Sequence, residues 1–182
     1  MNKISDFGFV VIYVLSISFS GLLISLDNNL VDEYEFGLII PESCTSSSQL
    51  SDEYSCEKLF DGLTSVWSDN SNACNDETWI EFYFNREYFI EFIVLRNPES
   101  PEWFYTSHKI KNFMIQTTNG TVLTKMLEND DTQQWLDINE YISELKIEIL
   151  DTYPSEKYGT YPATKDCVLM EVNFYGRIKS SF

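Results

Sequence analysis

The sequence predicts an all-β fold, either an antiparallel sandwich or a barrel. Short segments in which apolar and polar residues alternate follow one another along the chain, with clusters of turn-forming residues between them. Beyond residue 26, no stretch of about eleven residues or more has the periodicity of an amphipathic helix. Aromatic residues are abundant, with 13 Phe, 11 Tyr and 4 Trp, and such residues favour the pleated, half-buried surface of strands.

The chain of 182 residues begins with a hydrophobic targeting segment. After Lys3, residues 7–26 contain no charge, and Ser18 and Ser20 precede Gly21, which favours a cleaved signal peptide over residues 1–20. A run of about 20 apolar residues also spans a bilayer, so an uncleaved anchor helix that reaches residue 26 is the alternative. Either form places the domain outside the cell, secreted or held at the surface, with membrane contact only through this segment.

The formal net charge is −17, with 29 acidic and 12 basic residues. Lys and Arg form no cluster along the sequence, so the composition argues against nucleic acid as a partner. Anionic phospholipid head groups are disfavoured as ligands because they carry the same sign of charge as the domain. A basic protein partner, in contrast, is attracted over a long range.

Four cysteines in an exported chain predict two disulfide bonds. The four are Cys44, Cys56, Cys74 and Cys167, and three pairings are open. A zinc site is the competing interpretation, but the gaps of 11, 17 and 92 intervening residues lack the paired short spacings of such sites.

Residues 27–41 form an acidic linker that contains an edge strand, which Pro41 ends. The sandwich domain is expected over residues 42–177, and residues 178–182 form a tail. Near the start of the domain, Asp61-Gly62 predicts a tight turn, and Trp67 is expected in the core.

Seven further segments complete the expected strands. Residues 79–84 alternate and residues 88–95 are nearly all apolar, so each predicts a strand. Asn119-Gly120 lies between two alternating segments and predicts a hairpin. Residues 134–138 predict a short strand or a turn. Residues 145–150 and 171–176 alternate again, so each has one buried and one solvated face.

Two aromatic loops are predicted between these strands. Residues 99–109 combine Pro101 with Trp103, Tyr105 and His108, which favours a loop over a regular element. Residues 151–166 contain two prolines, a glycine and three tyrosines, so they continue neither neighbouring strand. Loops of this length are usually functional or disordered, and the strands on both sides favour function.

The order of several short motifs resembles that of the discoidin-like domains, the coagulation factor 5/8 type C or galactose-binding-like family. The motifs span residues 42–176 and are Leu59-Phe60-Asp61-Gly62, Trp67, Trp79-Ile80-Glu81-Phe82, residues 93–97, Leu145-Lys146-Ile147, residues 151–154, Lys157-Tyr158 and residues 171–176. The chain is most similar to the bacterial glycan-binding members associated with secreted NAD-glycohydrolases.

The resemblance implies a jelly-roll sandwich of about eight strands whose ligand loops gather at one end. Members bind sugars, phospholipid head groups or protein partners, and most catalyse no reaction. Some hold a structural calcium ion, the one cofactor implied, through residues that match Asp61 and Glu171. Here Leu63 replaces a second acid of the turn, which removes one charged oxygen from such a site. The resemblance also implies the pairs Cys74–Cys167 and Cys44–Cys56.

These observations predict a secreted or surface-tethered, non-catalytic module that recognises carbohydrate through its aromatic loops. Rings stack on sugar faces while imidazole and ammonium groups donate hydrogen bonds, or the rings instead cap the core. The candidate ligand-binding residues are Trp103, Tyr105, His108, Lys109, Tyr153, Lys157, Tyr158 and Tyr161. His108 is the one histidine and no nucleophile motif is present, which argues against an enzyme. The alternative is an adhesion domain whose acidic surface binds a basic cell-surface protein.

Overall fold

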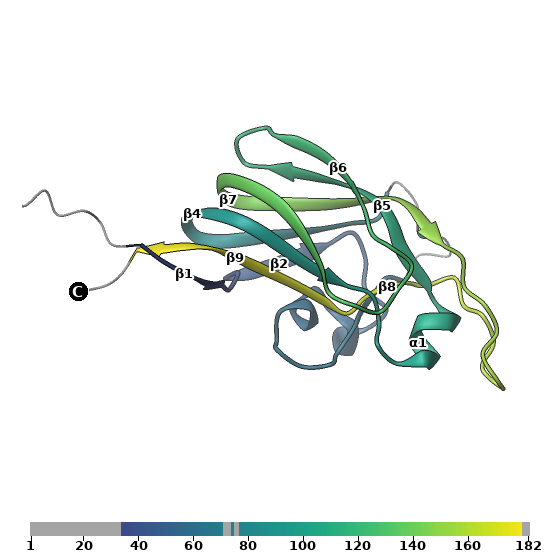
Figure 1. The fold of residues 1–182 in the computed structure, drawn as a ribbon. Helices are drawn as coiled ribbons and strands as arrows, with labels where there is room; N and C mark the ends of the chain where they lie inside the picture. Colours follow the sequence, from purple (N-terminus) through teal and green to yellow (C-terminus); the bar gives the residue numbers. More distant parts are fainter. Residues whose placement is uncertain (1–33, 71–73, 75–76, 180–182) are drawn as a thin grey trace, which may run out of the picture. The chain divides into compact units, whose positions relative to one another are not determined.

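The computed structural model describes residues 34–70, 74 and 77–179 (Figure 1). The predicted signal or anchor lies outside the described residues. Within the described part, no helix is long and apolar enough to cross a membrane. All described residues belong to one compact unit.

Strands dominate the described part of the chain, which confirms the predicted all-β fold. The elements are β1 (Tyr34–Ile39), β2 (Ser43–Ser46), the 3-10 helices η1 (Asp52–Tyr54) and η2 (Cys56–Leu59), β3 (Trp67–Ser68), β4 (Trp79–Arg96), α1 (Pro101–Thr106), β5 (His108–Thr117), β6 (Val122–Met126), β7 (Gln134–Tyr153), β8 (Cys167–Leu169) and β9 (Glu171–Lys179). The sheet order is β1-β9-β4-β7-β5-β8-β3, with β2 paired to β4 and β6 paired to β5.

Two long bent strands fold this sheet into two layers. β4 and β7 are antiparallel, and their register shifts between Tyr83 and Tyr88, where both ribbons turn back in Figure 1. On one side of the bend they lie with β2 and β5, and on the other side with β9 and β1. The rings of Phe82 and Phe174 meet between the layers, with centroids 5.1 Å apart. The sandwich is therefore a curled sheet around one apolar core.

The alternating residues face this core as the sequence predicts. Trp67 is fully buried, and so are Ile147 and Ile149 of β7. Gly120, at the tip of the β5–β6 hairpin, has φ of 82°, a conformation that glycine adopts without strain. The predicted hairpin and its Asn-Gly turn are thus confirmed.

The structure corrects several element predictions. The segments 79–84 and 88–95, predicted as two strands, form the single strand β4, and β7 extends to Tyr153, three residues into the predicted 151–166 loop. Residues 101–106 of the predicted 99–109 loop form α1, and β5 already begins at His108. The segment 134–138 is not a separate short strand but the first part of β7, whose pairing with β4 continues past it. A six-residue helix is too short to show periodicity, and a strand that changes layers looks like two strands in sequence.

Both implied disulfides are present. Cys44 on β2 pairs with Cys56 on η2, and Cys74 pairs with Cys167 on β8, over sequence separations of 12 and 93 residues. The second bond ties the segment after β3 to the far end of the 151–166 region. It therefore fixes one base of that aromatic loop to the core.

Candidate functional site

The helix α1 follows β4 and owes its start to three adjacent residues. Ser100 has extended backbone angles at the N-cap, and Pro101 occupies the first helical position. A backbone N–H at that position would have no acceptor within the helix, so proline, which lacks the N–H, costs no hydrogen bond there. Glu102 adds a negative charge to the first turn, which the helix dipole favours. This Ser-Pro-Glu signal was visible in the sequence, and it is the one that identifies α1.

Lys109 holds the other end of α1 and does not reach the surface. Its side chain is buried at 3% exposure, and Nζ donates a hydrogen bond of 2.7 Å to the carbonyl oxygen of Phe104. The ammonium also lies 4.7 Å from the centre of the Phe104 ring. Burial lowers the pKa of Lys109, and the nearby Glu156 acts in the opposite direction. Lys109 thus stabilises the helix terminus, where cations are favourable.

The loop after β7 folds back against α1. The rings of Tyr105 and Tyr158 stack with centroids 5.2 Å apart and an interplanar angle of 8°. The backbone N–H of Glu156 donates to the Tyr105 carbonyl at 2.6 Å, and that of Thr164 donates to the Thr106 carbonyl at 2.7 Å. The two predicted aromatic regions therefore converge in one place.

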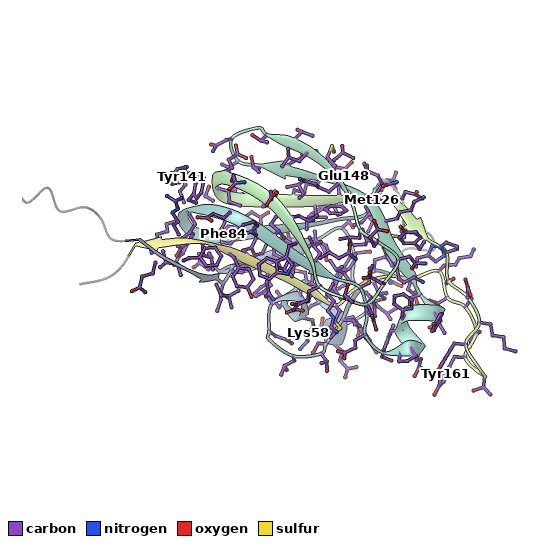
Figure 2. The ribbon with its side chains drawn as sticks, viewed as in Figure 1. Lys58, Phe84, Met126, Tyr141, Glu148 and Tyr161 are labelled. Atoms are coloured by element: carbon purple, nitrogen blue, oxygen red, sulfur yellow. A yellow bond between two sulfur atoms is a disulfide. The ribbon has the colours of Figure 1, made fainter. Side chains whose placement is uncertain are left out.

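The tip of this second loop is a small hairpin, here called the tyrosine hairpin (residues 154–166). Tyr158 and Tyr161 exchange two backbone hydrogen bonds, of 3.1 and 2.9 Å. Gly159 between them has φ of 57°. Both tyrosines and Lys157 are exposed. In Figure 2 the labelled Tyr161 lies at the outer tip of this hairpin.

Two open cavities flank α1, and Trp103 lines both. The larger, of about 360 Å³, is lined by Thr64, Val66, Pro98, Glu99, Ser100, Trp103 and Met170. The smaller, of about 150 Å³, is lined by Glu102, Trp103, Thr106, Tyr161, Pro162, Thr164 and Asp166. The Trp103 ring is half-buried and packs against Tyr54 of η1, with centroids 5.6 Å apart. Such clefts between an indole and a few polar groups suit small ligands.

Several residues of these cavities could not be selected from the sequence. Thr64 and Met170 lie on two segments far apart in the chain and line the larger cavity with Trp103. Tyr54, from a third segment, packs against the Trp103 ring. Glu99 forms an ion pair of 3.3 Å with Arg96, so its carboxylate is held at the rim of the larger cavity.

The tyrosine at the end of β7 makes contacts within the domain. Tyr153 belongs to the strand rather than to the loop, and its hydroxyl donates a hydrogen bond of 3.1 Å to the carbonyl of Leu127. Its ring also lies 5.7 Å from the ammonium of Lys111. Among the predicted ligand residues, Tyr153 and Lys109 therefore stand apart from the Trp103, Tyr105, Tyr158 and Tyr161 group.

This architecture has a known counterpart. Residues 33–175 match the model of the NAD glycohydrolase translocation F5/8 type C domain family. The chain belongs to this family. The match spans more than half of the chain and confirms the resemblance seen in the sequence motifs. No curated protein matches the chain.

Solved structures share the fold of this F5/8 type C domain. A family 32 carbohydrate-binding module of NanJ from Clostridium perfringens, in complex with galactose, has a TM-score of 0.60 at 14% identity, over 78% of this chain and 99% of that one. An F5/8 type C domain from Bacteroides fragilis has a TM-score of 0.56 at 13% identity, over 78% and 97%. A fucose-binding module from Streptococcus pneumoniae has 0.52 at 16%, over 74% and 90%.

The two carboxylates that the resemblance implies for a calcium site of this F5/8 type C domain both interact with other protein groups. Asp61 accepts a hydrogen bond of 2.8 Å from the Leu63 N–H and lies 3.9 Å from the Lys58 ammonium, which is itself a cation. Glu171 accepts hydrogen bonds from Gln133 and Asn173, at 3.1 and 2.5 Å. Each carboxylate thus has partners of its own. Among the described residues, the one cluster of three metal-ligand types contains the Cys44–Cys56 disulfide, whose sulfurs are already bonded.

Calcium is accordingly expected to leave the stability unchanged. The melting temperature in millimolar calcium should agree within about 1 °C with that in EDTA, because an ion that does not bind the folded state cannot stabilise it. Magnesium serves as the control for ionic strength. A rise of several degrees with calcium alone would show that the ion binds the folded domain, which contradicts this expectation.

His108 is the first residue of β5, and it pairs with Cys167, which directly follows the tyrosine hairpin. Its Nδ1 is 3.0 Å from the Thr152 hydroxyl, and its backbone N–H donates to the Asp166 carbonyl. Burial lowers the pKa of His108 below its ordinary value, and Lys109 acts in the same direction, whereas Asp69 and Asp166 oppose it.

This depressed pKa predicts a loss of stability in mild acid. The unfolded chain takes up the proton near pH 6.5, before the folded state does, so the free energy of unfolding falls as the pH drops through that value. Urea denaturation between about pH 7.5 and pH 5 measures the slope. His108→Gln, which keeps a hydrogen-bonding group beside Thr152, should flatten the slope, and an equal slope in both proteins contradicts the assignment.

Proposed function

We propose that this F5/8 type C domain is a secreted or surface-tethered module that binds carbohydrate at α1 and the tyrosine hairpin, without catalysis. The observation that carries the proposal is the convergence of two aromatic segments about fifty residues apart. Trp103 and Tyr161 line the open cavities beside α1, and Tyr105 of α1 stacks on Tyr158 of the tyrosine hairpin. The aromatic density and the shared fold of known carbohydrate-binding modules support it.

The chemistry of the cavities favours a neutral sugar. The apolar face of a pyranose stacks on an indole or phenol ring, while its hydroxyls need carboxylates and hydroxyls as partners. Glu99 and Ser100 supply such groups beside Trp103, and Asp166 does so in the smaller cavity. A sugar acid would meet these carboxylates and the −17 net charge, so a neutral hexose is the better ligand class.

The solved neighbours include binders of both neutral and acidic sugars. One is a galactose complex and another is a fucose-binding module, whereas a third, the carbohydrate-binding module of AlyQ, is in complex with 4,5-unsaturated mannuronic acid. At 14% and 16% identity these neighbours establish the fold, so they support the choice of sugars for the first experiment rather than a specific ligand.

A glycan array followed by calorimetric titration tests the function. We expect saturable binding to at least one group of neutral glycans, with dissociation constants between roughly 1 µM and 1 mM. Sialylated or otherwise acidic glycans form the matched control and should bind more weakly. If no sugar binds while a basic protein partner binds at the same loops, the domain is an adhesion domain and the proposal fails.

A further inference from the structure

The strand β1 forms an open edge of the curled sheet. In the described part of the chain, β1 is hydrogen-bonded to β9 alone, through six consecutive residue pairs without a bulge. Residues 36–40, Phe-Gly-Leu-Ile-Ile, carry no charge. Natural sheets usually protect an exposed edge with charges, bulges or prolines within the strand, because an open edge pairs readily with another strand. Over residues 36–40 this edge has none of these.

An exposed aromatic face adjoins the same edge. It consists of Phe36 on β1, Tyr175 on β9, Phe92 on β4 and Trp135 on β7, which lie across four adjacent strands. Tyr175 stacks between Phe36 and Trp135, at centroid distances of 6.1 and 5.2 Å, and Phe92 meets Trp135 edge to face. Phe36 and Trp135 are nevertheless 56% and 55% exposed, and Leu38 beside them is 45% exposed. Contiguous exposed apolar patches of this kind mark interaction surfaces.

The distribution of charged residues indicates which kind of partner fits this surface. The chain carries a net charge of −17, so copies of it repel each other over most of their surface. On the aromatic face, however, Arg177 pairs with Glu91 at 2.9 Å and also lies over the Phe89 ring. Two exposed carboxylates remain, Asp137 next to Phe92 in the register and Glu35 near the start of β1. This face therefore carries little charge and lacks the acidic cluster that a basic protein requires, and it suits another surface that is mostly apolar.

We propose that this surface binds a second copy of the chain, through antiparallel pairing of the two β1 strands about a twofold axis. Pairing of identical strands satisfies the free backbone groups of both edges at once, and the two aromatic faces then join into one continuous surface. Phe36 and Leu38 of each copy lie at the centre of this interface.

The dimer leaves the proposed sugar sites free. In Figure 2, Tyr141 at the bend of β7 and Tyr161 in the tyrosine hairpin lie at opposite ends of the domain, and the ring of Tyr141 packs on Phe89, which pairs with Arg177 beside β1. Two tyrosine hairpins would point away from the shared edge. If the proposed function holds, the dimer binds a glycan-covered surface with two sites, which raises its apparent affinity without any new contact.

Sedimentation velocity over about 1 to 100 µM protein tests the dimer, because association depends on protein concentration. We expect the dimer mass at the upper end of this range.

Leu38→Lys should raise the dissociation constant of the dimer at least tenfold, since the twofold axis brings two added charges together. Val122→Lys is the matched control, because Val122 is 57% exposed on β6, which is paired to β5. Both variants add the same charge, and only Leu38→Lys should dissociate the dimer.

Two results overturn the proposal. One is a monomer at the highest concentration, and if the Trp135 indole of that monomer is also shielded from an aqueous quencher, the N-terminal segment of the same chain covers the face instead. The other is an equal effect of the two lysine variants, which means that the β1 edge is not the contact. Neither of these results bears on sugar binding, so the proposed function is tested separately.

Discussion

Trp103→Ala should reduce the affinity for the selected sugar by roughly 30-fold or more, the loss expected for an aromatic residue at the centre of a binding site. Trp103 lines both cavities, so its removal takes away the stacking surface and merges the two spaces into one open depression. Its half-buried position against Tyr54 means that some stability is lost as well. Calorimetric titration gives the affinity, and urea denaturation shows that the variant is folded.

Trp135→Ala is the matched control for this experiment. It removes the same side chain from the outer sheet face, where Trp135 is 55% exposed and lines neither cavity. Sugar affinity should stay within about twofold of the original protein, since surface substitutions outside a contact have small effects. Equal losses for the two variants, or no loss for Trp103→Ala, contradict a site at α1.

Removal of the Cys74–Cys167 disulfide should have the largest effect on stability. The bond closes a loop with a sequence separation of 93 residues, and chain entropy predicts that its loss costs about 4.6 kcal/mol. The double variant Cys74→Ala/Cys167→Ala avoids a free thiol and is measured by urea denaturation. Because Cys167 begins β8, next to His108 in the parallel pairing with β5, the variant should also loosen the tyrosine hairpin and weaken sugar binding.

The other disulfide provides the comparison. Cys44→Ala/Cys56→Ala opens a loop with a sequence separation of only 12 residues, for which the same relation gives about 2.8 kcal/mol. Sugar affinity should change little in this variant when it is folded. A greater destabilisation from the short loop than from the long one contradicts the view that the long bond anchors the site.

The strands were predictable because the alternation of apolar and polar residues shows which face of each strand is buried. The alternation over residues 79–84 and 145–150 gives each strand its buried face, and the Asn119-Gly120 turn gives one hairpin its register. The helix α1 was missed because six residues make fewer than two turns, too few to display a period. Its Ser-Pro-Glu start was the only local signal.

The candidate site was only partly predictable, because its members meet through tertiary packing. Trp103, Tyr105, Tyr158 and Tyr161 were selected for their chemistry, and the structure brings the segments that carry them together. No sequence pattern indicated that Lys109 turns inward to the end of α1. Likewise, Tyr54 joins Trp103 from a polar segment without periodicity, and only the folded chain shows that contact.

The four tryptophans offer the most direct test of where a sugar binds, because each occupies a different environment. Trp67 is fully buried, Trp79 lies 5.2 Å from the Lys146 ammonium, Trp103 lines both cavities and Trp135 stands on the outer sheet face. Titration with a bound neutral glycan, followed through the four indole N–H signals by NMR, should shift the Trp103 signal strongly and leave that of Trp135 in place. A shift of Trp135 with an unmoved Trp103 would contradict a carbohydrate site at α1 and the tyrosine hairpin.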